Sequence, residues 1–347
     1  MTRARSTDDR PPTMNDVARR AGVSVATVSN TLNRPQLVTE STRLRVQEAI
    51  GELGFVRNST ARSLKLGVVN TVGLVLVDLG NSFFVDIARG AEGTTQEHGL
   101  SLMIANADVD LQRQDHYLNL FNEARVSGIL LAPLDASLEH VSSARTAGRP
   151  VVLVNYAARG YCGVVADDEL GGHLAARHLI EQGRTRLAFV GGPLTLGAVE
   201  ARMRGAQRAA DEAGLALVHL PTQSLNASEG RRIAAQIARM PARRRFDGVV
   251  TAADTLAMAC VQDLTAVHGL TVPGEVAVTG YDDNHFASDG PIPLSTVRQP
   301  GPAMGAAAAG LLLAELTGRP QHRHRTLTLK PSLVVRNSSV DTPHQPS

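Results

Sequence analysis

The sequence predicts a small all-α domain at the N-terminus, followed by two α/β lobes that each contain a doubly wound parallel sheet. Within residues 13–54, apolar residues recur at helical spacing between capping residues and glycines, which is the pattern of short packed helices. After residue 71, nearly continuous apolar runs alternate with helical stretches, which is typical of buried parallel strands in βαβ units. The 347 residues are enough to give each part its own core.

Three helices are expected in the N-terminal part, each starting after a hydroxyl side chain that can cap it. Thr13 has Asp16 three residues later, the spacing of a capping box, and Ser24 and Thr39 precede the other two helices. The expected helices cover residues 13–21, 25–32 and 40–53, with glycines at 22 and 54. Their apolar side chains are expected to form one small core: Val17, Ala18, Val23, Val28, Leu32, Leu44, Ile50 and Leu53.

A basic segment follows these helices. Asn58 can cap a short helix over residues 59–65, in which only Ala61 and Leu64 are suited to burial. A helix of this length is marginal alone. We therefore expect it to become ordered only when a partner holds it.

The α/β part contains nine expected strands, divided between two sheets at about residue 165. The apolar runs are 72–79, 100–106, 128–134, 150–156, 162–167, 187–192, 216–220, 248–254 and 276–283. Ligands of open parallel sheets bind beyond the carboxyl ends of the strands. Polar residues occur at those ends, including Asp78, Asn81, Asn106, Asp108, Asp135, Asn155, Asp254, Asp282 and Asp283.

The charge is unevenly distributed along the chain. Residues 1–65 carry 11 Lys/Arg and 6 Asp/Glu, a net charge of +5, and the whole chain carries only +2. A basic head on a mildly acidic body suits a module that binds a polyanion. The alternative is a basic tail that has no partner.

Several classes of protein are disfavoured by the sequence. Cys162 and Cys260 are far apart, which argues against a disulfide framework or a structural zinc site and fits a reducing compartment. The two histidines of residues 321–325 (QHRHR) have no acidic or cysteine neighbour in the sequence, so we expect a solvated loop and no metal. The start lacks the apolar stretch of a signal peptide, and no apolar run reaches about 18 residues.

The strongest motif is DVARRAGVSVATVSNTLN, residues 16–33, in which Ala18, Gly22 and Val28 have helix-turn-helix spacing. Such a motif places its second helix in the major groove of DNA. Val25 and Ala26 then suit thymine methyl groups, Asn30 suits adenine, and Ser24, Thr27 and Ser29 suit phosphates. The alternative is an ordinary three-helix core whose polar residues only cap helices or face solvent.

The motifs resemble those of the LacI (lactose repressor/galactose repressor) family over nearly the whole chain. The similar segments are TMNDVARRAGVSVATVSNTLN, TRLRVQEAIGELGFVRN, STARSLK, GNSFFVDIARGAE, RVSGILLAP, VVADDELGG, EARMRG, TGYDDNHFAS and PLSTVRQP. The resemblance implies a helix-turn-helix headpiece and a sensor of two lobes like periplasmic sugar-binding proteins. It also implies a homodimer on a pseudo-palindromic operator, with no cofactor and no catalytic residue.

The resemblance implies which residues contact DNA. They are Thr13, Met14, Asn15, Ser24, Val25, Ala26, Thr27, Ser29, Asn30, Asn33, Asn58, Ala61, Arg62, Leu64 and Lys65. Asn30 departs from the basic residue of many members, so the operator differs accordingly. Leu64 matches the hinge leucine that wedges into a base step of the minor groove, and its alternative is a lone apolar residue in a linker. Arg62 and Lys65 lie near phosphates in this scheme.

The resemblance also implies a ligand site in the cleft between the lobes. Arg202 and Asp282 match the ligand-anchoring arginine and aspartate, and the further matches are Asp167, Asp254, Phe83 and Phe84. Structural alternatives are that Asp167 caps a helix and that Phe84 belongs to the core. Ala253 replaces an asparagine of some members, and the region near Leu225 lacks their stacking aromatic ring, so neither lactose-type nor purine-type recognition transfers.

The sequence therefore predicts a cytoplasmic, nucleoid-associated transcriptional repressor without a membrane segment. A small molecule, a sugar, is expected to control it. The alternatives are a nucleobase or other non-sugar corepressor, a solute-binding protein, and an enzyme, for which no nucleophile–base pair is evident. The expected divisions are a disordered arm (1–12), a DNA-binding domain (13–57), a hinge helix and linker (58–70), a first lobe (71–165 with about 300–322), a second lobe (166–299 with about 323–338) and a tail (339–347).

Overall fold

A computed structural model describes residues 10, 12–55, 70–134, 138, 141, 148–318 and 322–340. The chain divides into two compact units, Met1–Val68 and Val69–Ser347, and each is described by itself. Within the described residues, no helix is long and apolar enough to cross a membrane.

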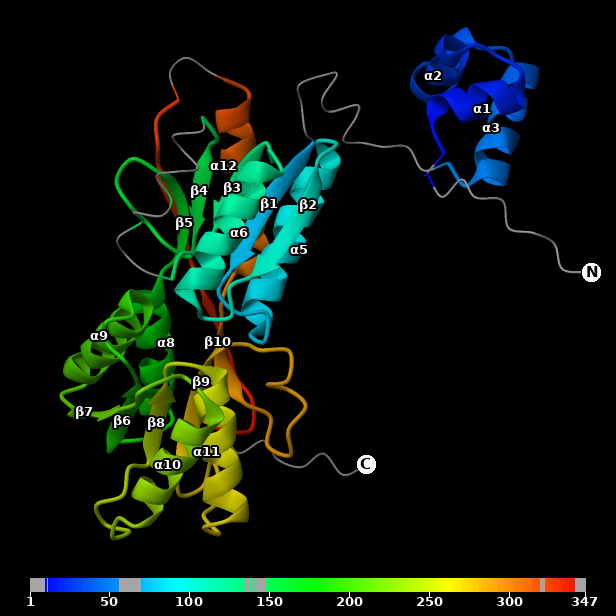
Figure 1. The fold of residues 1–347 in the computed structure, drawn as a ribbon. Helices are drawn as coiled ribbons and strands as arrows, with labels where there is room; N and C mark the ends of the chain where they lie inside the picture. The colour runs from blue at the N-terminus through cyan, green and yellow to red at the C-terminus, as the bar shows by residue number, and fades with distance from the viewer. Residues whose placement is uncertain are drawn as a thin grey trace, which may run out of the picture. The chain divides into compact units, whose positions relative to one another are not determined.

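The first unit is a bundle of short helices (Figure 1). Its elements are α1 (Met14–Ala21), α2 (Val25–Asn33), the 3₁₀ turn η1 (Pro35–Leu37) and α3 (Glu40–Leu53). The capping box is formed, since the backbone N–H of Thr13 donates to Asp16 Oδ2 over 2.9 Å. Gly22 ends α1 with φ 63°, a left-handed conformation that suits glycine. The expected helices therefore agree with the structure to within a residue.

The core of this unit differs from the expected set, because Leu44 does not belong to it, whereas Ala21, Val46 and Ala49 do. Val17, Ala18 and Val28 are buried as expected, but Leu44 is 55% exposed, so its assignment to the core is wrong. The buried stripe of α3 contains Val46 and Ala49, with Ile50 and Leu53 packed beside them. Leu44 precedes Val46 by two residues, about 200° around a helix, and therefore faces solvent. Thr39 precedes α3 as expected, but its side chain makes no capping bond to the helix backbone.

The second unit consists of two lobes with helices on both faces of each sheet (Figure 1). Lobe 1 contains β1 (Thr71–Leu76), α5 (Ser82–Glu97), β2 (Ser101–Asn106), α6 (Leu111–Glu123), β3 (Gly128–Leu131), β4 (Val151–Val154), β5 (Cys162–Ala166), α12 (Gly301–Leu316) and β11 (Thr326–Leu329). Lobe 2 contains α8 (Asp168–Glu181), β6 (Leu187–Gly191), α9 (Gly197–Glu212), β7 (Leu217–Pro221), α10 (Ala227–Ala238), β8 (Gly248–Thr251), α11 (Asp254–Ala266), β9 (Ala277–Asp282), β10 (Ser295–Arg298) and β12 (Ser332–Val334).

The two sheets have matching strand orders, which are β11–β5–β4–β3–β1–β2 and β12–β10–β9–β8–β6–β7. The predicted parallel pairing holds throughout lobe 1, whereas in lobe 2 β12 pairs antiparallel with β10. The sequence prediction missed β10, β11 and β12. These strands have three or four residues, and those of β11 and β12 are not fully buried, so they lack long apolar runs.

Two of the expected boundaries are corrected by the structure. β11 pairs in parallel with β5, so residues 326–329 belong to lobe 1 and not to lobe 2. Ser339, expected at the start of the tail, is 1% exposed, and its hydroxyl lies 2.7 Å from His178 Nε2. The chain crosses between the lobes where β5 leads into α8, where β10 leads into α12, and where β11 leads into β12.

Close helix pairs determine how each lobe packs. In lobe 1, α5 contacts α12, and a Cβ atom on Gly90 would lie 1.9 Å from the carbonyl oxygen of Pro302. In lobe 2, α8 contacts α9, and a Cβ atom on Gly205 would lie 1.8 Å from the carbonyl oxygen of Glu169. Only glycine allows backbones to approach this closely, so these residues set the distance between the helices.

We predict that Gly90→Ala destabilises the second unit by about 1–3 kcal/mol, because the added methyl group meets backbone that cannot move cheaply. Gly93→Ala is the matched control on the same helix, since its Cβ would have no atom within 4 Å. The control should be neutral or stabilising by up to about 1 kcal/mol, because alanine favours helix. Urea unfolding of the full chain checks both changes, and equal midpoints for the two variants would contradict the close-approach argument.

Candidate functional site

The first candidate surface is the exposed face of α2 in the first unit. Val25, Ala26 and Asn30 are exposed, whereas Val28 and Thr31 of the same helix are buried. The backbone N–H of Thr27 donates to Ser24 Oγ over 3.1 Å, which fixes the start of the helix. The helix therefore presents the residues expected to read bases, while its other face is held in the core.

The remaining residues expected to contact DNA are placed as follows. Thr13, Met14, Ser24 and Asn33 are exposed, as is Asn15. Thr27 and Ser29 are half-buried, and Asn33 Nδ2 donates to the Ser29 carbonyl over 2.8 Å. The residues predicted to contact DNA from the hinge lie outside the described residues: Asn58, Ala61, Arg62, Leu64 and Lys65.

Arg34 is a candidate that the sequence prediction did not include. It follows α2 directly and is exposed. Arg19, Arg20 and Arg43 each form an ion pair within the unit. Among the described residues, by contrast, Arg34 has no ion-pair partner, so its charge is available to a phosphate.

The second candidate site lies at the interface of the lobes and is organised by Arg202. This side chain comes from α9 and is only 5% exposed. Its Nε donates to Asp168 Oδ1 over 2.8 Å, and its Nη1 donates to the carbonyl oxygen of Ala252 over 2.7 Å. The guanidinium carbon lies 3.7 Å from the centre of the Tyr281 ring. These contacts fix the orientation of the guanidinium plane.

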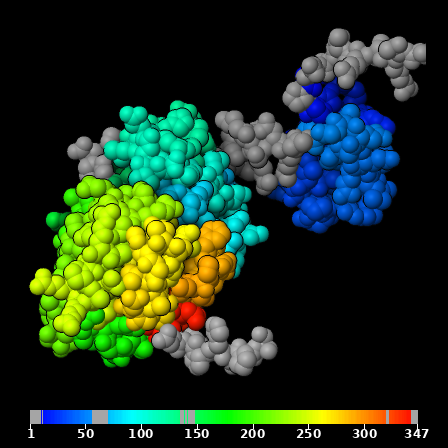
Figure 2. Space-filling model, turned by 90° about the horizontal axis from the view of Figure 1, so that it is seen from below, coloured from blue at the N-terminus to red at the C-terminus, as the bar shows by residue number. Residues whose placement is uncertain are grey.

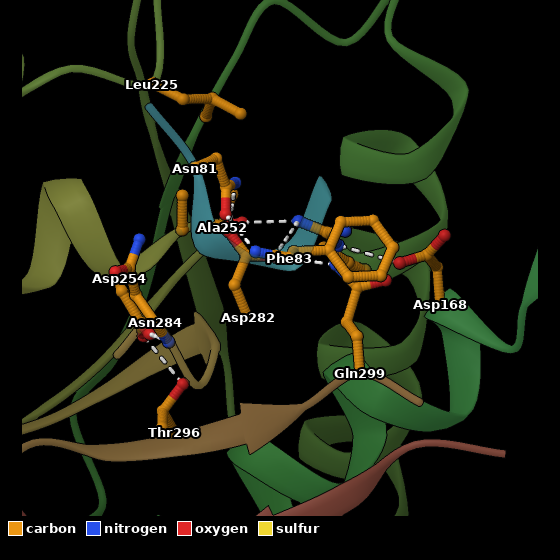
Figure 3. Close-up of polar contacts among 12 residues, drawn as sticks. Asn81, Phe83, Asp168, Leu225, Ala252, Asp254, Asp282, Asn284, Thr296 and Gln299 are labelled. Carbon is orange, nitrogen blue, oxygen red and sulfur yellow. Dashed lines mark hydrogen bonds and ion pairs between the residues drawn. The ribbon is translucent and has the colours of Figure 1, made fainter. Parts of the chain in front are cut away.

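Asp282 connects Arg202 to lobe 1. Asp282 is the last residue of β9, and its Oδ1 lies 3.9 Å from Arg202 Nη1. The same oxygen accepts a hydrogen bond from Gln299 Nε2 over 2.7 Å. Its Oδ2 accepts from Asn81 Nδ2 of lobe 1 over 3.0 Å, as the close-up shows (Figure 3). Asp282 therefore joins the two lobes through one carboxylate.

A second contact closes the same interface. The backbone N–H of His285 donates to Ser82 Oγ over 3.0 Å, and His285 Nε2 lies 3.2 Å from Asp86 Oδ1. In the space-filling view, the blue and cyan segments of lobe 1 lie directly against the yellow and orange segments of lobe 2 (Figure 2). Arg202 and Asp282 are buried at this interface, with 5% and 8% exposure.

The electrostatics follow from burial. Burial raises the pKa of the Asp282 carboxyl, and Arg202, Asn81 and Gln299 partly oppose this rise. Burial disfavours the charge on Arg202, but Asp168, Tyr281 and Asp282 more than offset it, so the pKa of Arg202 lies above its ordinary value. Asp282 also has φ 114°, a backbone conformation that costs free energy in any residue with a side chain.

Asp254 belongs to a separate buried cluster next to this network (Figure 3). Its Oδ1 accepts from Thr296 Oγ1 over 2.6 Å, and its Oδ2 accepts from the backbone N–H of Asn284 over 2.6 Å. Burial, together with the nearby Asp282, raises the pKa of Asp254 well above its ordinary value. With 1% exposure, Asp254 anchors the loop that follows β9.

The other residues expected at the ligand site have evident structural roles. Asp167 caps α8, because its Oδ1 accepts from the Leu170 N–H over 2.9 Å. Phe83 and Phe84 are 3% and 8% exposed and belong to the lobe 1 core. The backbone N–H of Phe83 also donates to Asn81 Oδ1 over 3.0 Å, and Asn81 in turn donates to Asp282. The structure thus brings Arg202, Asp282 and Phe83 together and places Asp167 and Asp254 in supporting positions.

Three polar residues of this site were not assigned from the sequence: Asn81, Asp168 and Gln299. Asn81 and Asp168 follow β1 and β5, and Gln299 follows β10. The position of polar residues at the carboxyl ends of strands was the available signal, and it picked out Asn81 without giving it a role. β10 was not predicted, so Gln299 carried no such signal.

The expectation that His322 and His324 have no acidic or cysteine partner is wrong, although residues 322–325 form an irregular segment in which His324 is exposed, as expected for a loop. His322 Nε2 lies 3.2 Å from Cys162 Sγ and 3.3 Å from Glu315 Oε1. His324 Nδ1 lies 3.8 Å from Cys162 Sγ and 3.5 Å from Glu315 Oε1. These partners are remote in sequence and are brought near by the packing of α12 and β5.

We predict that Arg202→Met destabilises the second unit by about 3–5 kcal/mol, because Asp168 and Asp282 lose their buried cation. Arg204→Met is the control, since Arg204 is on the same helix with a 52% exposed side chain in surface ion pairs and should cost little. Adding Asp168→Asn to Arg202→Met should recover part of the loss. Thermal unfolding of the three variants measures these losses of stability. Similar losses for Arg202→Met and Arg204→Met would contradict the prediction.

Comparison with known proteins gives two family matches. Residues 13–58 match the model of bacterial regulatory proteins of the lacI family. Residues 176–339 match a periplasmic binding protein-like domain. The first match spans the helix bundle, and the second includes Arg202 and Asp282.

Individual relatives cover nearly the whole chain. The ribose operon repressor of Escherichia coli (strain K12) is 34% identical over 335 residues, which is 94% of this chain and 99% of the relative. The HTH-type transcriptional repressor PurR of Aliivibrio fischeri (strain ATCC 700601 / ES114) is 30% identical over 94% of this chain and 98% of the relative.

Solved structures share the fold. The Lac repressor dimer bound to operator and the anti-inducer ONPF has a TM-score of 0.80 at 22% identity, over 96% of this chain and 100% of that one. A complex of the transcriptional regulator CelR with cellobiose has a TM-score of 0.67 at 29% identity, over 94% and 99% of the two chains. These matches confirm the predicted headpiece and two-lobed sensor, and the chain belongs to the LacI family of bacterial regulatory proteins.

Proposed function

We propose that the chain is a transcriptional repressor whose binding to operator DNA is controlled by a small polar ligand, a sugar, at the lobe interface. The observation that carries this proposal is the buried Arg202–Asp282 network, which both offers ligand-binding groups and holds the lobes together. One site can then sense a ligand and change the geometry of the sensor. The regulatory family to which the chain belongs agrees with the expectation that it is not an enzyme.

DNA binding is supported by the surface of α2. Val25, Ala26 and Asn30 project from a helix whose other face is fixed in the core, the arrangement that lets a recognition helix enter the major groove. We propose that these residues read bases and that Thr13, Met14, Asn15, Ser24, Thr27, Ser29 and Asn33 contact the backbone or adjacent bases. Arg34 adds a phosphate contact, and the hinge residues named from the sequence complete the interface.

A sugar is supported by the chemistry of the interface. Arg202 Nη2 forms no hydrogen bond with any described residue, so its N–H groups can donate to a ligand. Each oxygen of Asp282 accepts one hydrogen bond from a described side chain and has a further lone pair for a ligand hydroxyl. We propose that Phe83, whose backbone N–H donates to Asn81 Oδ1, supplies an apolar surface next to these groups. Such a set suits a ring with several hydroxyl groups.

The coupling follows from the contacts that a ligand must disturb. Asn81 Nδ2 donates to Asp282 Oδ2 across the lobes, so a hydroxyl that takes this partner changes the lobe contact. The lobe angle then changes, and the two hinge helices of a dimer no longer match the operator. By thermodynamic reciprocity, operator binding weakens ligand binding by the same factor, typically about 1–3 kcal/mol.

A homodimer is part of the proposal. The edge strands of both sheets expose apolar side chains, with Met103 and Ile104 at 41% and 45% on β2 and Val218 at 43% on β7. Covering such edges by a second copy removes apolar surface and unpaired backbone from water. A chain that sediments as a monomer at micromolar concentration would contradict this. We also propose a cytoplasmic location, at the nucleoid through operator binding.

A nucleobase acting as corepressor is the second candidate ligand. The observation that favours it is the 30% identity with a repressor named PurR. Corepression requires the opposite sign of coupling, so the ligand would strengthen operator binding. The direction of the effect therefore distinguishes the two candidates.

Anisotropy titration of labelled upstream DNA from the chain's own gene tests the proposal. The full chain is measured at fixed salt, alone and with single compounds from a panel of pentoses, hexoses, disaccharides and purines. We expect nanomolar, sequence-specific binding that one sugar weakens. If a purine strengthens operator binding, the purine and not a sugar is the ligand. Weak binding to every DNA fragment would reject the repressor function.

We predict that Asn30→Ala weakens operator binding by about 1–3 kcal/mol, because one bidentate base contact is lost. The loss should concentrate at one base pair of each half-site and leave nonspecific binding unchanged. Gln47→Ala is the control, since Gln47 is an exposed amide on α3 of the same bundle. Competition with single-base operator variants checks the result. An equal loss of affinity for operator and random DNA would show that Asn30 does not read a base.

A further inference from the structure

A cluster of metal-ligating side chains lies in lobe 1, apart from the two sites described above. Cys162, Glu315, His322 and His324 each offer one ligand atom, and these four atoms lie within 4.8 Å of one another. Cys162 begins β5, Glu315 is in the last turn of α12, and the histidines precede β11. Because β5 and β11 are parallel, the cluster lies at the amino ends of the strands, away from the lobe interface.

We propose that this cluster binds one divalent transition-metal ion of the zinc class, through Cys162 Sγ, Glu315 Oε1, His322 Nε2 and His324 Nδ1. This site is independent of the proposed repressor function and of the sugar site. It does not depend on any residue of the lobe interface.

The distances match a tetrahedron of ligands. Zinc binds nitrogen and oxygen at about 2.0–2.2 Å and sulfur at about 2.3 Å, so the edges of a tetrahedral site are about 3.3–3.7 Å. Sulfur lies 3.2 Å and 3.8 Å from the two imidazole nitrogens. The carboxylate oxygen lies 3.3 Å and 3.5 Å from the same nitrogens. Two of these four edges lie within the range that a central ion requires, and the other two lie within about 0.1 Å of it.

The hydrogen-bonding pattern around Glu315 also suits a bound metal ion. Glu315 Oε1 is buried and forms no hydrogen bond of ordinary geometry with a described residue, although two imidazole nitrogens lie within 3.5 Å. This carboxylate oxygen and the two imidazole nitrogens thus lie close together without pairing as donor and acceptor, as the ligands of one ion do. An ion at that point would satisfy the lone pair of the carboxylate.

The charge and the ligand types favour a zinc-class ion. A thiolate and a carboxylate carry two negative charges, which a divalent ion neutralises, and two neutral imidazoles complete the set. Sulfur and imidazole ligands suit zinc better than calcium or magnesium.

Binding would connect the elements that lead into the other lobe. β5 runs into α8, α12 follows the crossing from β10, and β11 runs into β12. The ligands lie at the ends of β5, α12 and β11 that are remote from these crossings, so one ion would fasten the three elements to one another within lobe 1. We therefore expect the bound ion to stabilise the second unit.

The test uses the full chain without a histidine tag, stripped by a chelator and titrated with zinc chloride or cobalt chloride. We expect one ion per chain, a sulfur-to-cobalt charge-transfer band and a higher unfolding temperature with zinc. Cys162→Ser should abolish the band, and His322→Ala with His324→Ala should weaken zinc binding by at least roughly 10- to 100-fold. His322 is half-buried and His324 is exposed, so the second variant is expected to fold, which circular dichroism verifies.

Two controls are available in the same chain. Cys260→Ser removes the other free cysteine, which is buried in lobe 2, and His116→Ala removes a histidine of α6 outside the cluster. Both should bind zinc and cobalt like the parent chain. The proposal is overturned if the parent shows no charge-transfer band, or if the double histidine variant binds zinc as tightly as the parent.

Discussion

Arg202 carries a positive charge inside the protein, and the interface between the lobes is arranged around it. Asp168 fixes one edge of the guanidinium, the carbonyl of Ala252 fixes another, and Asp282 lies 3.9 Å from it. A buried cation of this kind is stable only when it has such partners. Since Asp282 also accepts from Asn81 of lobe 1, the same charge that orders lobe 2 determines how the lobes meet. The account of ligand control depends on this shared carboxylate.

The surrounding fold explains why Arg202 can be held this way. Gly172 and Gly205 let α8 and α9 approach within backbone contact, since a Cβ atom on either would lie within 2 Å of a carbonyl oxygen of the facing helix. Asp168 begins α8 and Arg202 lies near the crossing of the two helices, so close packing brings the pair together. The close packing of α8 and α9 therefore also determines the electrostatic partner of Arg202 in this lobe.

Much of the architecture was predictable because buried parallel strands require long apolar runs, and helix caps leave local signals. Thr13, Ser24 and Gly22 marked the N-terminal helices correctly, and Arg202 and Asp282 were named from a resemblance. Leu44 was wrongly assigned to the core, because the sequence does not show which face of α3 packs against the other helices. The strands after residue 290 were missed because they are short and depend on neighbours for pairing. Contacts between residues distant in sequence, such as Cys162 with His322, follow only from tertiary packing.

The central claim is that ligand binding and operator binding are coupled through the lobe interface. Isothermal titration of the identified sugar into the full chain, with and without saturating operator DNA at the same salt, tests it most directly. Sugar binding should be weaker on the operator, by the same factor by which the sugar weakens operator binding. Equal sugar affinity in the two titrations would contradict the account, because a ligand with no preference between the two states cannot control DNA binding.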